Sequence, residues 1–473
     1  MNLKSIVQPG LTVLTREQKD LVHRSSLQIL AEVGIRVDSL KALKVFSSSK
    51  RVKINDNLVL IEPELIDWAI ARVPRIIDIY KRNGSLSFYL GKDSTRFGIG
   101  TTNLFYLEPG TDDVIPFTRD HMKLGTRLAN SLENYDLVSP IGILKDVHPA
   151  RQDLIGTLEM AANTCKPLVL LVSDPSQFTP SLDLMENLFK DLVTKPFLIP
   201  YFNPVTPLVI NRDTGDKMIE TISRGLPFIF SNYSMVGTTS PITPAGTLSL
   251  LNAELLAGLV LTQIAKEGAS IILGSLPAFF DMKSMVDYYD PLTILLNEAI
   301  AEMMEFYQIP HAGTSGSGNG WGMDIPASGM LWLNHLIACI GKTGLAPFVG
   351  GSLGSKVFSP ETVVYADEII TQLRRFTNGF IFDDESIGMD TISKIGPGGN
   401  FLFSKTTSQK YKENLWESQL FPNISLEKWQ DLGKPKASEK LKDRTIKLIY
   451  EAHAPEDNQE ILRKGEEFIS KIL

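Results

Sequence analysis

Residues 228–276 read FIFSNYSMVGTTSPITPAGTLSLLNAELLAGLVLTQIAKEGASIILGSL, and this stretch decides the fold. It begins with an apolar run of strand length, Phe228–Tyr233, and ends with a second one, Ser270–Leu276. Between them Thr243-Pro244 places a capping side chain before a proline, which is typical of the start of a helix. The order of strand, helix and strand predicts a parallel βαβ unit.

The same unit repeats along the central part of the chain. Eight runs of strand length alternate with helical patterns: Thr95–Gly100, Leu137–Ile143, Leu168–Val172, Phe197–Phe202, Phe228–Tyr233, Ser270–Leu276, Pro310–Gly313 and Ala346–Gly351. Eight βα units are the number that closes a parallel barrel, which takes ~250 residues. An open doubly wound sheet is the alternative, but no G-x-G-x-x-G turn follows the first strand. The sequence therefore predicts an α/β fold, a TIM (β/α)8 barrel.

Two further segments flank the predicted barrel. Residues 1–82 are expected to form a helical extension packed on it, because Thr15 and Gln18 make a capping box before an amphipathic run. Residues 83–380 hold the catalytic barrel, and residues 381–473 form a polar helical tail. We expect Trp416 and Trp429 to hold this tail against the barrel.

Composition excludes several classes of protein. The chain has 473 residues, 43% of them apolar, and 47 basic against 54 acidic residues give a net charge of −7. Without a basic stripe, a nucleic-acid partner is not expected. The apolar runs fall short of the ~20 residues of a membrane span, and the N-terminus lacks the apolar core of a secretory signal. With only two cysteines, the chain fits a reducing cytoplasm.

The usual catalytic motifs are missing from the sequence. The six histidines include no pair at the spacing of a helical zinc site, and there is no C-x-x-C motif and no phosphate-binding loop. One G-x-S-x-G string occurs at 350–354, but the next helix signal, Ser359-Pro360, comes too late for a nucleophile elbow. The sequence therefore predicts no metal site and no acid–base pair or nucleophile as the catalyst.

The predicted carboxyl ends of the strands are rich in aromatic and amide side chains, and barrel enzymes place their sites at these ends. The candidate substrate-binding residues are Phe97, His148, Asn203, Tyr233, Phe279, Trp321 and Lys356. Ring faces with few charges nearby suit a quaternary ammonium ion, which they bind by cation–π attraction. The alternative for each ring is that it caps the core, and for Lys356 that it is merely solvated.

Four stretches carry a family resemblance: SSLQILAEVGIRVDS at Ser25–Ser39, GTTSPITPAGTL at Gly237–Leu248, DDESIGMD at Asp383–Asp390 and IGPGGNFL at Ile395–Leu402. In these the chain resembles the trimethylamine methyltransferase family, in the branch that lacks pyrrolysine. The resemblance implies a TIM barrel that moves a methyl group from an amine to the cobalt of a partner corrinoid protein. The corrinoid (cobalamin) would then come with the partner, and no cofactor would be bound on this chain.

The resemblance also bears on the substrate. The glycine-rich region around Ser315–Asp324 holds only standard residues, so it offers no electrophile comparable to pyrrolysine. That points to an amine already activated by its charge, which leaves as a neutral tertiary amine. Glycine betaine, giving dimethylglycine, is the first choice, with Asn203, His148 or Lys356 holding its carboxylate. Carnitine, γ-butyrobetaine and proline betaine stay open.

Two other functional classes remain as alternatives. A non-catalytic betaine-binding protein would use the same aromatic site without methyl transfer. A barrel aldolase or isomerase would need a Schiff-base lysine or acidic metal ligands on the strands, and Lys145 and Lys356 fall in predicted loops. The sequence does not decide whether copies of the chain form a homo-oligomer.

Overall fold

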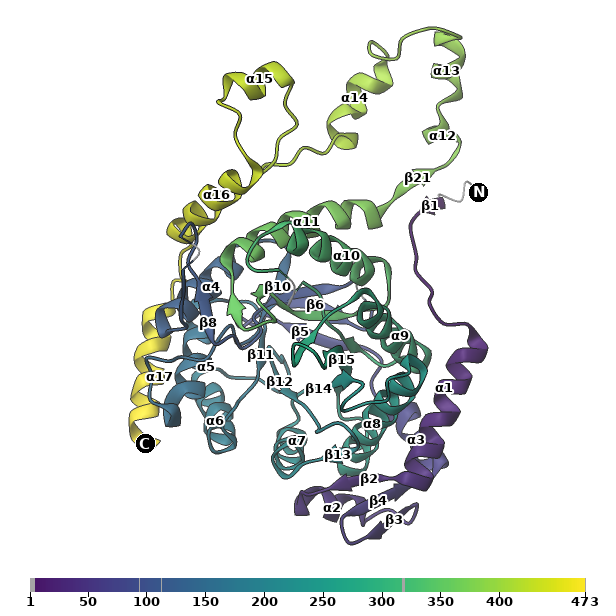
Figure 1. The fold of residues 1–473 in the computed structure, drawn as a ribbon, viewed down its shortest axis with the longest axis vertical. Coiled ribbons are helices and arrows are strands. Elements are labelled where there is room, and N and C mark those ends of the chain that lie inside the picture. The colour runs from purple at the N-terminus through teal and green to yellow at the C-terminus, as the bar shows by residue number, and fades with distance from the viewer. Residues whose placement is uncertain (1–4, 93, 112, 317–319, 473) are drawn as a thin grey trace.

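The computed structural model describes residues 5–92, 94–111, 113–316 and 320–472, and its centre is a closed barrel of eight parallel strands (Figure 1). The strands are β7 (Arg96–Ile99), β10 (Tyr135–Val138), β11 (Leu168–Leu170), β12 (Leu198–Phe202), β14 (Phe228–Val236), β15 (Ile271–Asp281), β17 (His311–Ala312) and β18 (Leu345–Val349). The barrel closes because β18 pairs with β7 and β14 pairs with β15. The predicted TIM barrel and all eight predicted strands are confirmed.

A helix follows each strand and lies on the outside of the barrel (Figure 1). These helices are α4 (Arg119–Ser131), α5 (Gln152–Asn163), α6 (Phe178–Leu188), α7 (Arg212–Arg224), α8 (Pro244–Ala265), α9 (Pro291–Tyr307), α10 (Ile325–Ile340) and α11 (Pro360–Asn378). Ser359 caps α11 and Asp290 caps α9, since their side chains accept hydrogen bonds from the third backbone amide of each helix. Thr243, which was expected to cap α8, makes no such side-chain hydrogen bond.

Helix α8 is the one described helix that is long and apolar enough to cross a membrane. Within this helix, 78% of the most apolar stretch is buried inside the protein. It packs between the strands β14 and β15 and the N-terminal helices α1 (Arg16–Gln28) and α3 (Pro63–Arg72). Its apolar character on all sides therefore reflects a central place in the core.

A hairpin closes the amino-terminal end of the barrel. Its strands are β5 (Ile77–Tyr80) and β6 (Leu86–Leu90). Phe88 and Ile79 form one buried apolar cluster with inward-facing strand residues such as Ile229 and Leu345. The expected boundary between residues 82 and 83 falls in the turn of this hairpin, so the extension and the barrel share one core at this end.

The N-terminal segment is a mixture of helix and sheet. The capping box of Thr15 and Gln18 begins α1, as predicted. Besides α1, α3 and α2 (Leu40–Phe46), the segment contains β2 (Ile35–Val37), β3 (Val52–Asn55) and β4 (Leu58–Ile61). These strands join β13 (Val209–Ile210) of the barrel in a four-stranded sheet. The sequence pattern predicted the helices and not these short strands, because three or four residues give too little alternation.

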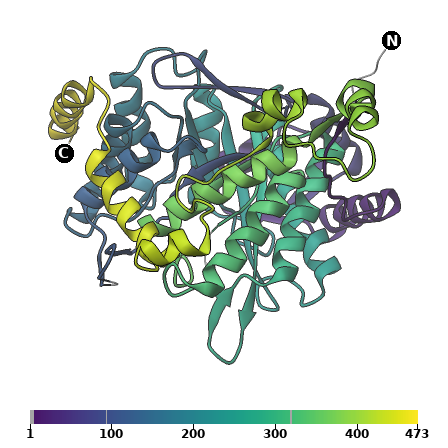
Figure 2. The same cartoon turned by 90° about the horizontal axis from the view of Figure 1, so that it is seen from above.

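Hairpins surround the carboxyl-terminal end of the barrel. One sheet combines the hairpin of β8 (Phe105–Leu107) and β9 (Val114–Pro116) with β19 (Gly351–Ser352) and β20 (Val357–Phe358). Strand β15 runs beyond the barrel and turns back as β16 (Val286–Tyr288). This long hairpin lies at the lower edge of Figure 2.

The C-terminal tail leaves the barrel and then returns to it. Strand β21 (Phe380–Phe382) pairs with β1 (Ser5–Val7), and α12 (Asp384–Ile387), α13 (Met389–Ile395), α14 (Lys405–Asn414) and α15 (Leu426–Asp431) project from the body (Figure 1). The tail then ends in α16 (Ala437–Glu451) and α17 (Asn458–Ile472), which pack on the barrel helices.

One of the two tryptophans of the tail differs from our expectation. Trp429 is 36% exposed, and its indole donates to the Pro435 carbonyl within the projecting segment, so it does not hold the tail to the barrel. Trp416 is partly buried in the stretch that returns to α11. There the ring of Phe421 contacts Tyr365 at 6.1 Å and makes the attachment.

Candidate functional site

Side chains on β12 and β14 alternate between the two sides of the barrel wall. Ile199 and Ile229 belong to the apolar cluster inside the barrel. Because successive strand residues face opposite sides, Tyr201 on β12 and Tyr233 on β14 also face inward, nearer the carboxyl end. Tyr201 makes an edge-to-face contact with Phe348 of β18 at 5.2 Å between ring centroids. Aromatic rings therefore line the inside of the barrel below its mouth.

Polar contacts fix the orientation of these rings. The amide nitrogen of Asn203 donates to the Tyr201 hydroxyl at 3.3 Å and to the Ser231 carbonyl at 2.7 Å, which ties β12 to β14. The Tyr233 hydroxyl donates to the carboxylate of Asp287 on β16. The hairpin that extends from β15 thus brings one acidic group to the inward-facing tyrosines.

Tyr289, directly after β16, completes the group. Burial raises its pKa well above the ordinary value, and the negative charge of Asp287 acts in the same direction. Burial likewise raises the pKa of Tyr201 and of Tyr233. We call Tyr201, Tyr233, Tyr289 and Phe348 the mouth cluster. Its three phenols stay protonated at neutral pH and present neutral rings.

The mouth cluster and Asp287 form an arrangement suited to a cation that cannot donate hydrogen bonds. Each ring face attracts a quaternary ammonium by roughly 0.5–2 kcal/mol, depending on how far water is excluded. The strand residues facing inward here, Tyr201, Asn203, Ser231, Tyr233 and Phe348, carry no charge. The charge at the cluster is therefore the carboxylate of Asp287, which favours a positively charged ligand.

Of the predicted site residues, the structure brings Asn203 and Tyr233 together at this place. Phe97 lies elsewhere: it is fully buried on the outer side of the barrel wall, and its ring meets His335 of α10 at 5.4 Å. The Arg374 guanidinium lies over the same ring at 5.9 Å. Phe97 thus packs between barrel and helices and does not face the mouth.

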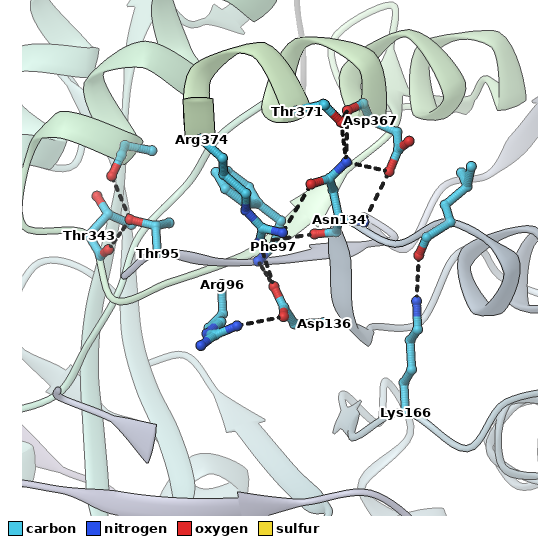
Figure 3. Close-up of polar contacts among 12 residues, drawn as sticks. Thr95, Arg96, Phe97, Asn134, Asp136, Lys166, Thr343, Asp367, Thr371 and Arg374 are labelled. Carbon is cyan, nitrogen blue, oxygen red and sulfur yellow. Dashed lines mark hydrogen bonds and ion pairs between the residues drawn. The ribbon is translucent and has the colours of Figure 1, made fainter. Parts of the chain in front are cut away.

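Figure 3 shows that the surroundings of Phe97 stabilise the fold and do not form a binding site. Arg374 of α11 donates to Asn134 and to Asp136 at 3.0 Å each, and Asp136 also accepts from Arg96 and from the backbone of Phe97. The network ties α11 to the amino-terminal ends of β7 and β10. Phe97 is held within it.

The other four predicted residues lie around the rim. Phe279 is partly buried, and its ring lies 6.4 Å from Tyr288 on the outer side of the β15–β16 hairpin. Trp321 is 82% exposed. His148 and Lys356 are exposed, and His148 caps a short helical turn by accepting from the amide of Ala150. The structure does not bring these four side chains into contact with the mouth cluster.

Comparison with known proteins assigns the family. The model of the trimethylamine methyltransferase (MTTB) family matches residues 2–472. The chain belongs to this family. A glycine betaine methyltransferase of Desulfitobacterium hafniense (strain Y51) is 26% identical over 89% of each chain. A trimethylamine methyltransferase of D. hafniense (strain DSM 10664 / DCB-2) is 24% identical over 96% of this chain and 94% of its own.

A solved structure agrees with the fold. The monomethylamine methyltransferase of Methanosarcina barkeri superimposes with a TM-score of 0.50 at 9% identity, over 93% of this chain and 88% of its own. The likeness concerns the fold alone. The family match makes this chain an enzyme of a family that transfers methyl groups from methylated amines.

The sequence analysis did not select four residues of this candidate site. They are the rings of Tyr201, Tyr289 and Phe348 and the carboxylate of Asp287. Tyr289 and Asp287 belong to a hairpin that the sequence did not predict. Tyr201 carried a signal, since strict alternation along β12 from Ile199 selects Tyr201 and Asn203 as the inward pair. Phe348 had a weaker one, because the register of β18 shifts between Ala346 and Val349. Such an irregularity hides the alternation in the sequence.

Other groups that could suggest different chemistry are enclosed. Ser315 and His335 form a pair at 2.6 Å, but both side chains are buried, and burial lowers the pKa of His335 to about 3. Ser352 of the G-x-S-x-G string is buried in a β-hairpin beside Thr362, so the string is not a nucleophile elbow. Among the described residues no group of three metal-ligating side chains occurs.

Proposed function

We propose that this enzyme transfers a methyl group from a quaternary amine, with glycine betaine as the first candidate, to cobalt(I) of a corrinoid carried by a partner protein. One observation carries the proposal: inside the barrel, the Asp287 carboxylate binds the hydroxyl of Tyr233, one of three neutral tyrosines of the mouth cluster. This arrangement recognises a fixed positive charge. The glycine betaine methyltransferase relative supports the substrate.

The reaction makes small demands on the protein's own side chains. A quaternary ammonium leaves as a neutral tertiary amine once its methyl carbon is attacked, so no proton has to be supplied. The corrinoid brings the strong nucleophile. The mouth cluster then has to orient one N-methyl group toward the barrel opening and exclude water from it. The tyrosines suit this role because burial keeps them protonated and uncharged. Reduced cobalt fits the reducing cytoplasm that we propose as the location.

A direct assay tests the transfer. The purified chain is mixed with cob(I)alamin and glycine betaine, carnitine, γ-butyrobetaine or proline betaine, and methylcobalamin is followed by its absorbance. We expect methylation of cobalt with at least one of these amines and formation of the demethylated amine. Binding without methylation would support a betaine-binding protein instead. If the chain shows no binding and no methylation with any of these amines, the proposal is refuted.

Asp287 favours a second candidate, a quaternary amine without a carboxylate. A zwitterion would bring its own negative charge close to Asp287, and the inward-facing strand residues at the mouth cluster, Tyr201, Ser231, Tyr233 and Phe348, offer no cation in return. Choline and glycine betaine have nearly the same size and differ in this charge. We expect Asp287→Asn to lower the kcat/KM of choline about tenfold relative to that of glycine betaine.

The control for this variant is Asp281→Asn. Asp281 lies on the same hairpin but is bonded to the turn residues Lys283 and Ser284, away from Tyr233. Its neutralisation changes the hairpin charge equally and should leave the ratio of the two substrates unchanged. If both variants change the ratio of kcat/KM for choline and glycine betaine equally, the effect comes from long-range charge and not from contact between Asp287 and the substrate.

A further inference from the structure

A projecting arm, residues 380–414, leaves the barrel after α11 and returns to it. It comprises β21, α12, α13 and α14 (Figure 1). It begins directly after Gly379, which ends α11, and it ends where the Arg375 side chain donates to the carbonyl of Asn414 at 2.5 Å. No described residue of its three helices is buried. The arm therefore lacks a core of its own.

Large apolar side chains cover this arm. Ten of them are at least 40% exposed, among them Phe382, Met389, Leu402 and, at 88%, Phe403. Since an aromatic residue can bury about 150–250 Å², these side chains together present on the order of 1,000 Å². The largest apolar patch of a typical monomer is about 300–600 Å², and a stable complex needs about 800 Å² per partner. The arm has the surface of an interface.

The strand at the root of the arm leads to the same conclusion. Strands β1 and β21 pair over three residues each, and no other strand in the described part of the chain joins them. Ile6, Val7 and all three residues of β21 are exposed, so neither face of the ribbon is covered. An isolated two-stranded ribbon is marginally stable in water at best. The ribbon gains stability when another surface packs on it.

The charges of the arm are divided between its two halves. Residues 380–397 carry Asp383, Asp384, Glu385 and Asp390 against Lys394, so the first half is net acidic. Residues 398–414 carry Lys405, Lys410 and Lys412 against Glu413, so the second half is net basic. When two copies meet about a two-fold axis with their arms antiparallel, the acidic half of each faces the basic half of the other. A two-fold interface requires this kind of self-complementarity.

The position of the arm separates it from the mouth. Helix α11 ends beside Asn134 and Asp136, which begin β10, so the arm starts at the amino-terminal end of the barrel. Figure 2 shows the arm on the upper side and the β15–β16 hairpin of the mouth on the lower side. A protein that delivers a corrinoid to the mouth would approach the opposite end.

We infer that the arm is a homodimerisation element, whose occupant is the arm of a second copy of this chain in antiparallel orientation. The interface joins the apolar surfaces of the two arms, and charge pairs between α12–α13 of one copy and α14 of the other fix their direction. Dimerisation leaves both barrel mouths open, so it is independent of the proposed methyl transfer.

The first test measures the mass of the full-length protein in solution by light scattering after gel filtration. We expect a dimer, or a multiple of it, and a monomer for Phe403→Asp. Tyr450→Asp serves as the matched control, because Tyr450 is 83% exposed on α16 outside the arm and should keep the wild-type mass. A monomeric wild type, or a Phe403→Asp variant with the wild-type mass, would overturn the inference.

A charge-swap test addresses the antiparallel direction. One variant carries Asp384→Lys, Glu385→Lys and Asp390→Lys, and the other carries Lys405→Glu, Lys410→Glu and Lys412→Glu. Each alone places like charges opposite one another, so we expect its dimer to dissociate at least tenfold more readily at low salt. A 1:1 mixture should form heterodimers. If the heterodimer of the two variants dissociates as readily as either variant's homodimer, the antiparallel pairing is contradicted. Thermal unfolding serves as the control: an unfolding temperature equal to that of the wild type shows that each variant is correctly folded.

Discussion

The two ends of the barrel are built from different kinds of side chain. At the amino-terminal end, Phe88 and Ile79 of a hairpin fill the interior with apolar groups, and the Arg374–Asp136 network seals the wall. At the carboxyl-terminal end, three tyrosines and Phe348 meet a carboxylate. The first end holds the molecule together and the second offers a binding surface, as in other barrels. Variants at the two ends should therefore separate stability from affinity.

The largest effect is expected at the amino-terminal end. Phe88 is 2% exposed inside the plugged barrel, so Phe88→Ala leaves a cavity and should lower the free energy of unfolding by roughly 3–5 kcal/mol. Denaturant unfolding measures this loss. The KM of the folded fraction for a quaternary amine should stay within twofold of the wild type. A selective rise in KM without loss of stability would contradict the division between the two ends.

A smaller effect is expected behind the carboxyl-terminal end, at Glu254 of α8. This buried carboxylate accepts hydrogen bonds from Thr206, Leu208 and Asn232, so it ties α8 to β14 and to the segment after β12. Burial raises its pKa to about 7. Below pH 4.5 the group is protonated in both states. As the pH rises to about 7, the unfolded chain releases the proton first, so the folded state loses stability.

The measurement compares the wild type with Glu254→Gln by urea unfolding between pH 4.5 and 8. The wild type should lose on the order of 3 kcal/mol relative to the variant over this range, and the difference should level off above pH 7–8. Because glutamine also misplaces one hydrogen bond, the slope with pH is the readout and not the absolute stability. Parallel curves would show that Glu254 does not titrate as its burial implies.

The smallest effect distinguishes the two sides of the barrel wall. Tyr201→Leu keeps an apolar side chain but removes a ring face of the mouth cluster. The variant should weaken binding of a quaternary amine by about 0.5–2 kcal/mol, which is roughly 2- to 30-fold. Phe97→Leu is the matched control on the outer side and should leave the affinity unchanged, since its ring contacts His335. Titration calorimetry compares both. Equal losses would place Phe97 in the site after all.

The sequence predicted the fold well because βα repeats leave several independent signals. The strand runs, the capping box of Thr15 and Gln18, and the cap Ser359 agree with one another, and each corresponds to an element in the structure. Short strands such as β2–β4 gave no such pattern. They acquire their conformation from pairing with β13, a contact distant in the chain.

The site was harder to predict, because the sequence shows which residues end a strand but not which way they face. Asn203 and Tyr233 were chosen and face the interior, whereas Phe97, one position away from the inward register, faces the helices. Asp287 and Tyr289 reach the cluster only because β15 runs on beyond the barrel and folds back as β16. That reversal is a tertiary feature, and no local motif announces it.

The central claim is that the carboxyl-terminal interior of the barrel binds an N-methyl group that is already positively charged. A crystal structure of the protein with a bound quaternary amine tests it most directly. The account predicts the ammonium nitrogen among the rings of Tyr201, Tyr233, Tyr289 and Phe348, with one methyl group turned toward the opening. An amine bound on the rim, or an interior that leaves it no space, would contradict the account.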